Sequence, residues 1–126
     1  MAKFKPEIKL EHSDSRGEIY SIALPGDREL MLLRSNSGVL RGGHYHDCDE
    51  IVVVLSGQMR YHKIIDGREI ERTLTKGNQS FNPAYENHMG EFLDETWLIE
   101  YKFAKKGEWK QVDYKPFRDQ VRASII

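Results

Sequence analysis

Short β-rich runs separated by turn residues recur along most of the chain, and this pattern constrains its fold more than any other feature. Turn residues such as Pro25-Gly26-Asp27, Ser56-Gly57 and Asp66-Gly67 each separate two such runs. Asp-Gly between alternating runs predicts a hairpin, because a type I′ turn needs positive φ at both central residues. Strand signals repeated at about 8–12 residue spacing are typical of antiparallel sandwiches and barrels. We therefore predict an all-β fold.

The C-terminal residues 114–126 carry the one plausible helix. Pro116 fits the first turn of a helix, and Phe117, Val121 and Ile125 follow one another at intervals of four residues. A last strand or a docked extension fits the same segment. The prediction is therefore a short C-terminal helix or an extension.

Length and composition limit the kinds of protein that the chain can form. Its 126 residues suffice for one hydrophobic core, so we expect a single domain over residues 1–126. The formal net charge of -1 predicts no general attraction to nucleic acid or to an anionic membrane. No run approaches the roughly 18 apolar residues that span a bilayer, and the N-terminal segment lacks the apolar stretch of a secretory signal. Cys48 is the only cysteine, which fits a reducing compartment, and we expect a cytoplasmic protein.

Four side chains in the middle of the chain have the chemistry of a metal site. His44 and His46 lie one residue apart, so in a strand both imidazoles can point to the same side. Glu50 opens the apolar run that follows. If its carboxylate faces the core, it must be paired or bound to a metal, because an isolated buried charge is too costly. His88 follows a later turn and can reach the same interior. Three imidazoles and one carboxylate suit Mn, Fe, Co, Ni, Cu or Zn and leave room for water or substrate.

The spacing of these residues resembles the two motifs of the cupin superfamily. The first motif has the pattern G-x5-H-x-H-x3-E-x6-G, in which x is any residue. Residues 38–57 match it at every fixed position, with Gly38, His44, His46, Glu50 and Gly57. Residues 77–92 resemble the second motif through its glycine, proline and histidine. Tyr85 and Phe92 stand where glycine and asparagine are usual in that motif.

The resemblance implies a double-stranded β-helix, the cupin or jelly-roll barrel. It also implies that His44, His46, Glu50 and His88 bind a divalent transition metal such as Mn, Fe, Ni, Cu or Zn. The protein would then act on a small polar substrate as a metal-dependent isomerase or dioxygenase. Small barrels commonly bury an open sheet face against a second copy, so we expect a homodimer.

A narrower resemblance points to chemistry without a metal. Asp14-Ser15-Arg16-Gly17 and the segment from Arg41 to His46 look like the layout of the cupin-fold sugar-nucleotide ketoisomerases and their epimerase relatives. That resemblance implies His44 as the base, His46 as its partner in proton transfer, and Arg41 as a ligand for a diphosphate. It makes a carbohydrate derivative our first expectation for the substrate. A cupin that binds a small molecule without catalysis is a third function class, and all three stay open.

Further side chains are candidates for the wall of a pocket inside the barrel. They are polar or aromatic, or flexible like methionine, and most fall in the strand runs near the two motifs. The predicted pocket-lining residues are Arg41, Met59, Tyr61, His62, Tyr85 and Phe92.

Overall fold

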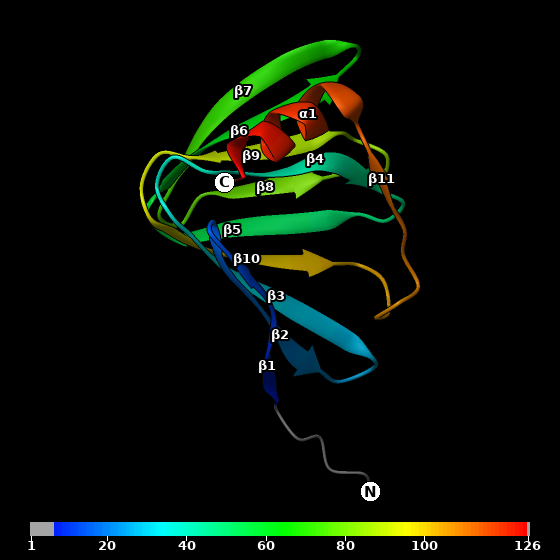
Figure 1. Cartoon of the computed structure of the whole chain (residues 1–126). Coiled ribbons are helices and arrows are strands. Elements are labelled where there is room, and N and C mark those ends of the chain that lie inside the picture. Colours follow the sequence, from blue (N-terminus) through cyan, green and yellow to red (C-terminus); the bar gives the residue numbers. More distant parts are fainter. Residues whose placement is uncertain (1–6, 126) are drawn as a thin grey trace, which may run out of the picture.

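The computed structural model describes residues 7–125, which form eleven strands and one helix (Figure 1). The first six residues, part of the segment in which we find no secretory signal, lie outside this range. The elements are β1 (Ile8–Asp14), β2 (Gly17–Leu24), β3 (Arg28–Ser35), β4 (Leu40–His46), β5 (Glu50–Ser56), β6 (Gln58–Ile65), β7 (Arg68–Thr75), β8 (Gln79–Asn82), β9 (His88–Phe92), β10 (Thr96–Lys102), β11 (Gln111–Asp113) and α1 (Lys115–Ser124).

Two antiparallel sheets make up the molecule. The six-stranded sheet has the order β1-β2-β3-β10-β5-β8, and the five-stranded sheet has the order β11-β4-β9-β6-β7. Neighbours in both sheets are often far apart in sequence, as with β10 between β3 and β5. The predicted all-β barrel of the cupin or jelly-roll type is confirmed.

The core lies between the sheets and follows from the alternation of side chains along each strand. In β5, Val52 and Val54 are buried, whereas Ile51 and Val53 on the other face are half-buried. Strands of the opposite sheet, β6 and β9, supply side chains to the same core. The buried cluster consists of Leu33, Val52, Val54, Met59, Tyr61, Leu74, Phe92 and Leu98.

The predicted Asp-Gly hairpin joins β6 to β7. Ile65 pairs with Arg68 across the turn, which leaves two loop residues. Asp66 and Gly67 have φ of 51° and 75°, the positive values that a type I′ turn requires. This local prediction is confirmed.

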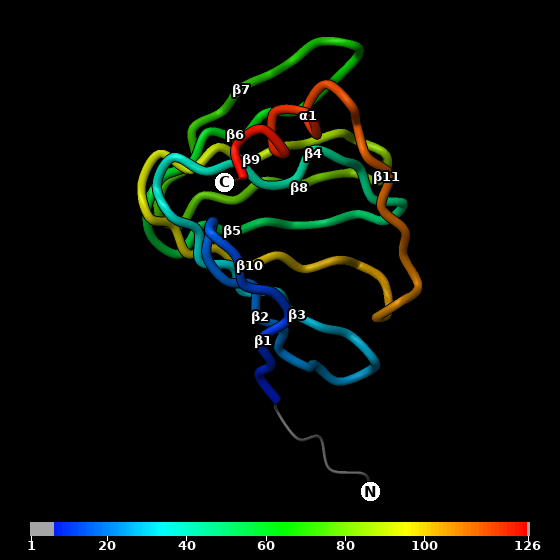
Figure 2. Tube along the Cα trace, viewed as in Figure 1, coloured from blue at the N-terminus to red at the C-terminus, as the bar shows by residue number. Residues whose placement is uncertain are grey.

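The C-terminal segment is a helix, α1, with Pro116 in its first turn as predicted. Phe117 and Val121 are its buried residues, and they pack with Met89 in a second apolar cluster. Ile125 is the C-cap and is exposed, so it does not extend this buried face. Figure 2 shows the chain passing from β10 through β11 to α1, which lies against β4. Within the described residues, no helix has the length and apolar character needed to cross a membrane.

Candidate metal centre

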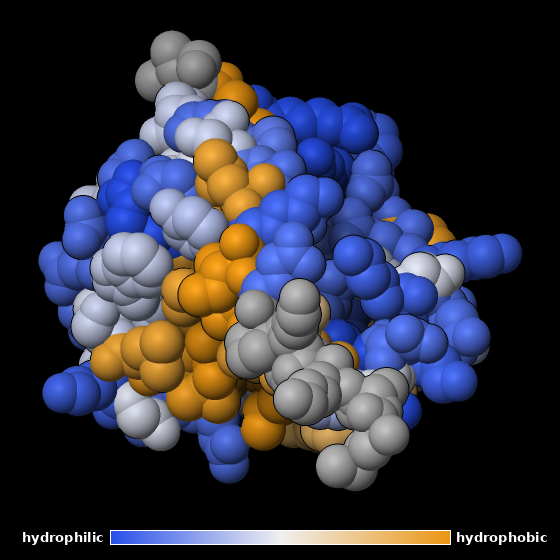
Figure 3. All heavy atoms as spheres, turned by 90° about the horizontal axis from the view of Figure 1, so that it is seen from below, coloured by the Kyte–Doolittle hydropathy of each residue, from blue (hydrophilic) through white to orange (hydrophobic). Residues whose placement is uncertain are grey.

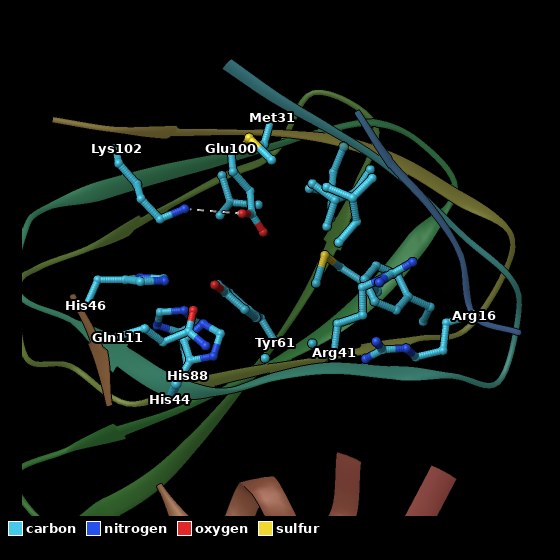
Figure 4. Close-up of a pocket in the computed structure, with 18 of the residues that line it drawn as sticks. Arg16, Met31, Arg41, His44, His46, Tyr61, His88, Glu100, Lys102 and Gln111 are labelled. Atoms are coloured by element: carbon cyan, nitrogen blue, oxygen red, sulfur yellow. Dashed lines mark ion pairs between the residues drawn. The ribbon is translucent and has the colours of Figure 1, made fainter. Parts of the chain in front are cut away.

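Strands β4 and β9 bring three imidazoles together at one end of the barrel interior (Figure 4). His44 and His88 are cross-strand partners, and His46 follows His44 on the same face of β4. The ring centroid of His44 lies 4.6 Å from that of His46 and 5.0 Å from that of His88. One ring nitrogen from each of the three lies within 4.8 Å of the others. The geometry therefore forms a compact cluster of three nitrogen donors.

Gly43 lets helix α1 pack closely against the strand that carries two of these histidines. Its φ is 87°, and a Cβ built on it would lie 3.0 Å from the backbone nitrogen and Cα of Arg118. Arg118 also donates from Nη1 to the carbonyl of Gly42 at 3.0 Å. The helix thus supports β4 on the side away from the imidazoles, and glycine is needed for both the conformation and the close approach.

Glu50 opens β5 and is 1% exposed, with its carboxylate beside the imidazoles. Its Oε1 lies 3.7 Å from His88 Nε2, and its Oε2 lies 3.8 Å from His46 Nδ1. Asn82 donates from Nδ2 to Oε1 at 2.9 Å, and Lys102 Nζ lies 3.2 Å from Oε2. The carboxylate is therefore paired, as a buried charge must be, and its partner in the protein is a lysine.

Burial keeps the three imidazoles neutral at ordinary pH. Burial and then the neighbouring His88 and His46 lower the pKa of His44 to about 2. Burial also lowers the pKa of His46 to about 4, against the opposing effect of Glu50, and it lowers the pKa of His88. For Glu50, burial raises the pKa, but Lys102 and the two histidines outweigh it, so the pKa lies below its usual value. Neutral imidazoles beside a carboxylate anion are the protonation states that metal ligation needs.

Two observations show that these residues fit a bound metal ion. His88 Nδ1 lies 3.1 Å from the carbonyl oxygen of Glu86, so Nδ1–H donates there and the lone pair of Nε2 faces the cluster. His44 Nδ1 is buried, and it has no hydrogen-bond partner among the described residues. A buried nitrogen without a partner is unfavourable, and a ligand that binds at Nδ1 would satisfy it. The imidazoles of His44, His46 and His88 suit a divalent transition metal, whereas the Glu50 carboxylate lies beside them but outside the group of donor atoms that lie within 4.8 Å of one another.

A cavity of about 290 Å³ extends from the imidazoles through the barrel. Four of the predicted pocket-lining residues, Arg41, Met59, Tyr61 and Phe92, lie on its wall. Apolar side chains from the six-stranded sheet also line this cavity. They are Ile19, Met31, Leu33, Val52 and Leu98.

The prediction that His62 lines the cavity is wrong. The inward residues of β6 are Met59 and Tyr61, so His62 has the opposite parity and lies outside the barrel. Phe117 of α1 covers its ring at 6.4 Å between centroids. Its two nitrogens lie 3.1 Å from Glu69 and 3.2 Å from Glu91, so it belongs to a separate His/Glu cluster on the outer surface.

Tyr85 does not line the cavity either. Its side chain is 66% exposed and lies against Tyr45, with 5.6 Å between ring centroids. Its φ of 70° falls in the left-handed region that favours glycine, which is the residue usual at this place in the cupin motif. The turn keeps its backbone shape and directs the tyrosine outward.

Sequence reasoning missed two charged residues of β10, Glu100 and Lys102, which both line the cavity. Lys102 lies 3.2 Å from Glu50 Oε2 and 3.8 Å from Glu100 Oε2. Burial and the negative charge of Glu50 raise the pKa of Glu100 to about 7. The alternation of Leu98, Glu100 and Lys102 is the signal that could have revealed them. This signal is weak because the residues on the other face of β10, Trp97, Ile99 and Tyr101, are also largely apolar.

Comparisons with known proteins support the fold. No protein-family model matches the chain, and no curated protein matches it. Among solved structures, CapF, a capsular polysaccharide assembling protein from Staphylococcus aureus, aligns with a TM-score of 0.65 at 21% identity, covering 81% of this chain and 30% of CapF. A deletion variant of Bacillus subtilis oxalate decarboxylase aligns with a TM-score of 0.67 at 15% identity, covering 86% and 30%. Vicilin from Corylus avellana aligns with a TM-score of 0.70 at 11% identity, covering 86% and 34%.

The chain thus spans about a third of the length of these neighbours. At such identities the likeness concerns the arrangement of strands, and the site residues come from this chain's own geometry. Two facing antiparallel sheets, the three imidazoles inside them and these structural neighbours lead to one conclusion. The chain has the cupin fold.

Proposed function

We propose that the protein is a metal-binding cupin that acts on a small polar substrate as a metal-dependent isomerase or dioxygenase. The observation that carries this proposal is the cluster of His44, His46 and His88, whose nitrogens lie within 4.8 Å of one another at the end of a cavity. Burial keeps these imidazoles neutral, so their lone pairs are free for a metal. The metal would be Mn, Fe, Ni, Cu or Zn, since all of these accept nitrogen and carboxylate ligands.

Each residue of the site has a distinct part in this proposal. The three histidines and Glu50 hold the metal, which when bound would supply a Lewis acid for an oxygen atom of the substrate. Asn82 fixes the Glu50 carboxylate through its 2.9 Å hydrogen bond, and donates to the Tyr61 hydroxyl at 2.7 Å. A carbohydrate derivative is the substrate class we propose, and CapF, a structural neighbour, is a capsular polysaccharide assembling protein.

Metal content tests the proposal directly. Elemental mass spectrometry of tag-free wild type should find a near-stoichiometric transition metal, and His46→Ala should lose it. His12→Ala is the matched control, because His12 is an exposed histidine whose ring pairs with Asp14. A folded wild type that holds no metal and takes up none of the five ions when they are added would refute the proposal.

One observation favours a second candidate, proton transfer without a metal. Lys102 lies 3.2 Å from Glu50 Oε2, so the carboxylate already has a counter-charge. In this candidate His44 and His46 move the proton of a sugar-nucleotide ketone. Glu50→Gln separates the two functions. Loss of activity with unchanged folding supports the metal enzyme, whereas tolerance of the change favours proton transfer by the histidines.

We also propose that the protein forms a homodimer through the outer face of the six-stranded sheet. The outward residues of four adjacent strands, β2, β3, β10 and β5, include large apolar side chains. The apolar residues of this face are Tyr20, Ile22, Leu24, Leu30, Leu32, Ile51, Val53, Trp97, Ile99 and Tyr101, all half-buried. Seen from below, the side where β1, β2 and β3 lie in Figure 1, hydrophobic side chains form a continuous band (Figure 3).

The mass in solution tests the homodimer. Light scattering should give twice the mass of 14.7 kDa for the wild type and the monomer mass for Ile99→Lys. Ile70→Lys is the control, since Ile70 is 46% exposed on β7 of the other sheet. A wild type that is monomeric at tens of micromolar would contradict this assignment.

A further inference from the structure

The outer face of the five-stranded sheet carries a second group of metal-ligand side chains, separate from the imidazoles inside the barrel. Two adjacent strands supply it, β6 and β7, and β7 is the edge strand of the sheet (Figure 1). His62 of β6 pairs directly with Glu71 of β7, and Glu69 precedes Glu71 on the same face. One ligand atom from each of these three residues lies within 4.8 Å of the other two. We call His62, Glu69 and Glu71 the outer cluster.

The imidazole of His62 is fixed between carboxylates on both sides. Its side chain is 9% exposed, because Phe117 of α1 covers the ring. Its Nδ1 lies 3.1 Å from Glu69 Oε2 and 3.5 Å from Glu71 Oε1. Its Nε2 lies 3.2 Å from Oε1 of Glu91, which belongs to the neighbouring strand β9. Both ring nitrogens therefore face oxygens that can only accept hydrogen bonds when ionised.

A neutral imidazole cannot satisfy this arrangement. It has one N–H group, so one of its two nitrogens directs a lone pair at a carboxylate oxygen. Two acceptors this close repel each other unless a cation lies between them. That cation is either a second proton on the ring or a metal ion.

The charges around the outer cluster favour a divalent ion over a proton. Arg60 lies 3.3 Å from Glu91 Oε1 through Nη1 and 3.9 Å from Glu71 Oε2 through Nε. Among the described residues it is the only lysine or arginine within 4.0 Å of Glu69, Glu71 or Glu91. One guanidinium and a ring proton leave one of the three negative charges uncompensated. One guanidinium and a divalent ion compensate all three.

The distances on the Nδ1 side fit a transition metal. Two nitrogen or oxygen ligands about 2.0–2.2 Å from a tetrahedral zinc ion lie roughly 3.4 Å apart. The separations from His62 Nδ1 to Glu69 and Glu71, 3.1 Å and 3.5 Å, are close to this value. On the other side of the ring, Nε2–H then donates to Glu91, as a metal-bound histidine usually donates its second N–H to a carboxylate. The glutamate side chains are 46% and 54% exposed, so solvent can reach the ion and complete its coordination.

We infer that His62, Glu69 and Glu71 form a second metal site, for Zn²⁺, on the outer surface of the barrel. Two of its ligands come from the edge strand β7 and one from β6, so a bound ion ties that edge to the rest of the sheet. The site uses none of the residues that line the cavity, and it does not depend on the proposed function.

Calorimetric titration of chelator-treated, full-length protein with Zn²⁺ tests the inference. Glu71→Gln keeps the shape of the side chain and removes one charged ligand. It should lose one equivalent of bound Zn²⁺ relative to wild type, or bind that equivalent at least 10-fold more weakly, since even the loss of a group that orients a ligand costs roughly 10- to 100-fold. Glu95→Gln is the matched control, because Glu95 is 62% exposed and pairs with Arg34 outside the outer cluster. It should bind Zn²⁺ as the wild type does.

The variant His46→Ala separates this inference from the proposed function. If both sites bind Zn²⁺, wild type binds two equivalents, and Glu71→Gln and His46→Ala bind one each. If the barrel site fails alone, wild type and His46→Ala both bind one equivalent and Glu71→Gln binds none. Equal binding of Zn²⁺ by Glu71→Gln and wild type overturns the inference, whatever His46→Ala does, and so does a wild type that binds none.

The ring signals of His62 decide if Glu71→Gln does not fold. In wild-type protein labelled with ¹⁵N, the Nδ1 resonance of His62 should shift when Zn²⁺ is added, and that of the exposed His12 should not. A His62 resonance that stays unchanged up to a tenfold excess of Zn²⁺ overturns the inference and leaves a ring proton as the cation.

Discussion

Replacing Lys102 with methionine should destabilise the metal-free protein strongly. Lys102 is the counter-charge of Glu50, at 3.2 Å, and the two side chains are 11% and 1% exposed. Removing one partner of a buried ion pair costs about 3–5 kcal/mol, because the other charge stays buried without compensation. For a chain of this length, that corresponds to a fall in melting temperature of about 10–20 °C. The hydrogen bond from Asn82 remains and favours the lower part of that range.

The same substitution should strengthen metal binding. Without Lys102 no cation competes for Glu50 Oε2, and a bound metal provides the missing positive charge. Melting temperatures by differential scanning calorimetry, with and without added metal, should therefore show a larger stabilisation by metal in Lys102→Met than in wild type. Lys105→Met, which changes an exposed lysine, is the control for the loss of a surface charge.

Two results would refute this reasoning. If Lys102→Met melts within a few degrees of Lys105→Met in the absence of metal, the ion pair with Lys102 is not what stabilises the buried negative charge of Glu50. If metal restores no more stability to the variant than to the wild type, Glu50 is not a ligand.

The lowered pKa of His46, about 4 against 6.5, means that the folded state binds fewer protons than the unfolded chain below pH 6.5. Metal-free protein should therefore lose about 3 kcal/mol through this group as pH falls from 6.5 to 4, and His46→Ala should flatten that slope in pH-dependent urea unfolding. Gly43→Ala should cost about 1–3 kcal/mol more than Gly107→Ala in urea unfolding, because both have positive φ but only Gly43 faces another backbone at 3.0 Å. Phe117→Ala, at a residue 1% exposed, should cost about 3–5 kcal/mol by the same measurement and detach α1 from β4, which loss of helix signal in circular dichroism would report.

Local chemistry explains why some elements could be predicted from the sequence. The β6–β7 hairpin depends on two adjacent residues that accept positive φ, and Asp66-Gly67 supplies them. Pro116 and the four-residue interval from Phe117 to Val121 are compatible with the helix α1, but the same segment also fits a last strand or a docked extension, and only the structure, with α1 packed against β4, shows the helix. The hairpin signal lies within two residues, so it needs no knowledge of distant strands.

The clustering of the three histidines was predictable for a related reason. His44 and His46 share a face because side chains alternate along a strand. The spacing of the cupin motifs then connects them with His88, and β4 and β9 do pair at His44 and His88. The assignment of these residues and Glu50 as ligands remains a prediction that the metal analysis tests.

The strands with apolar or polar residues on both faces could not be oriented from sequence. In β10, Leu98 and Ile99 are equally apolar, so nothing local shows that Glu100 and Lys102 point inward. In β6, sequence reasoning predicts that His62 faces inward, whereas Phe117 of α1 covers its ring from outside the barrel. Which face is inner depends on packing against a second sheet and a helix from elsewhere in the chain.

The sequence by itself determined the β-rich pattern, its turns and the grouping of histidines on one strand face, because each depends on backbone preferences over short distances. Only the tertiary structure decided that Lys102 pairs with Glu50 and that Arg41 is a buried cation at the far end of the same cavity. The physical reason is that burial and pairing of a charge are set by strands distant in sequence. The balance between desolvation and an available counter-charge exists only once the two sheets face each other.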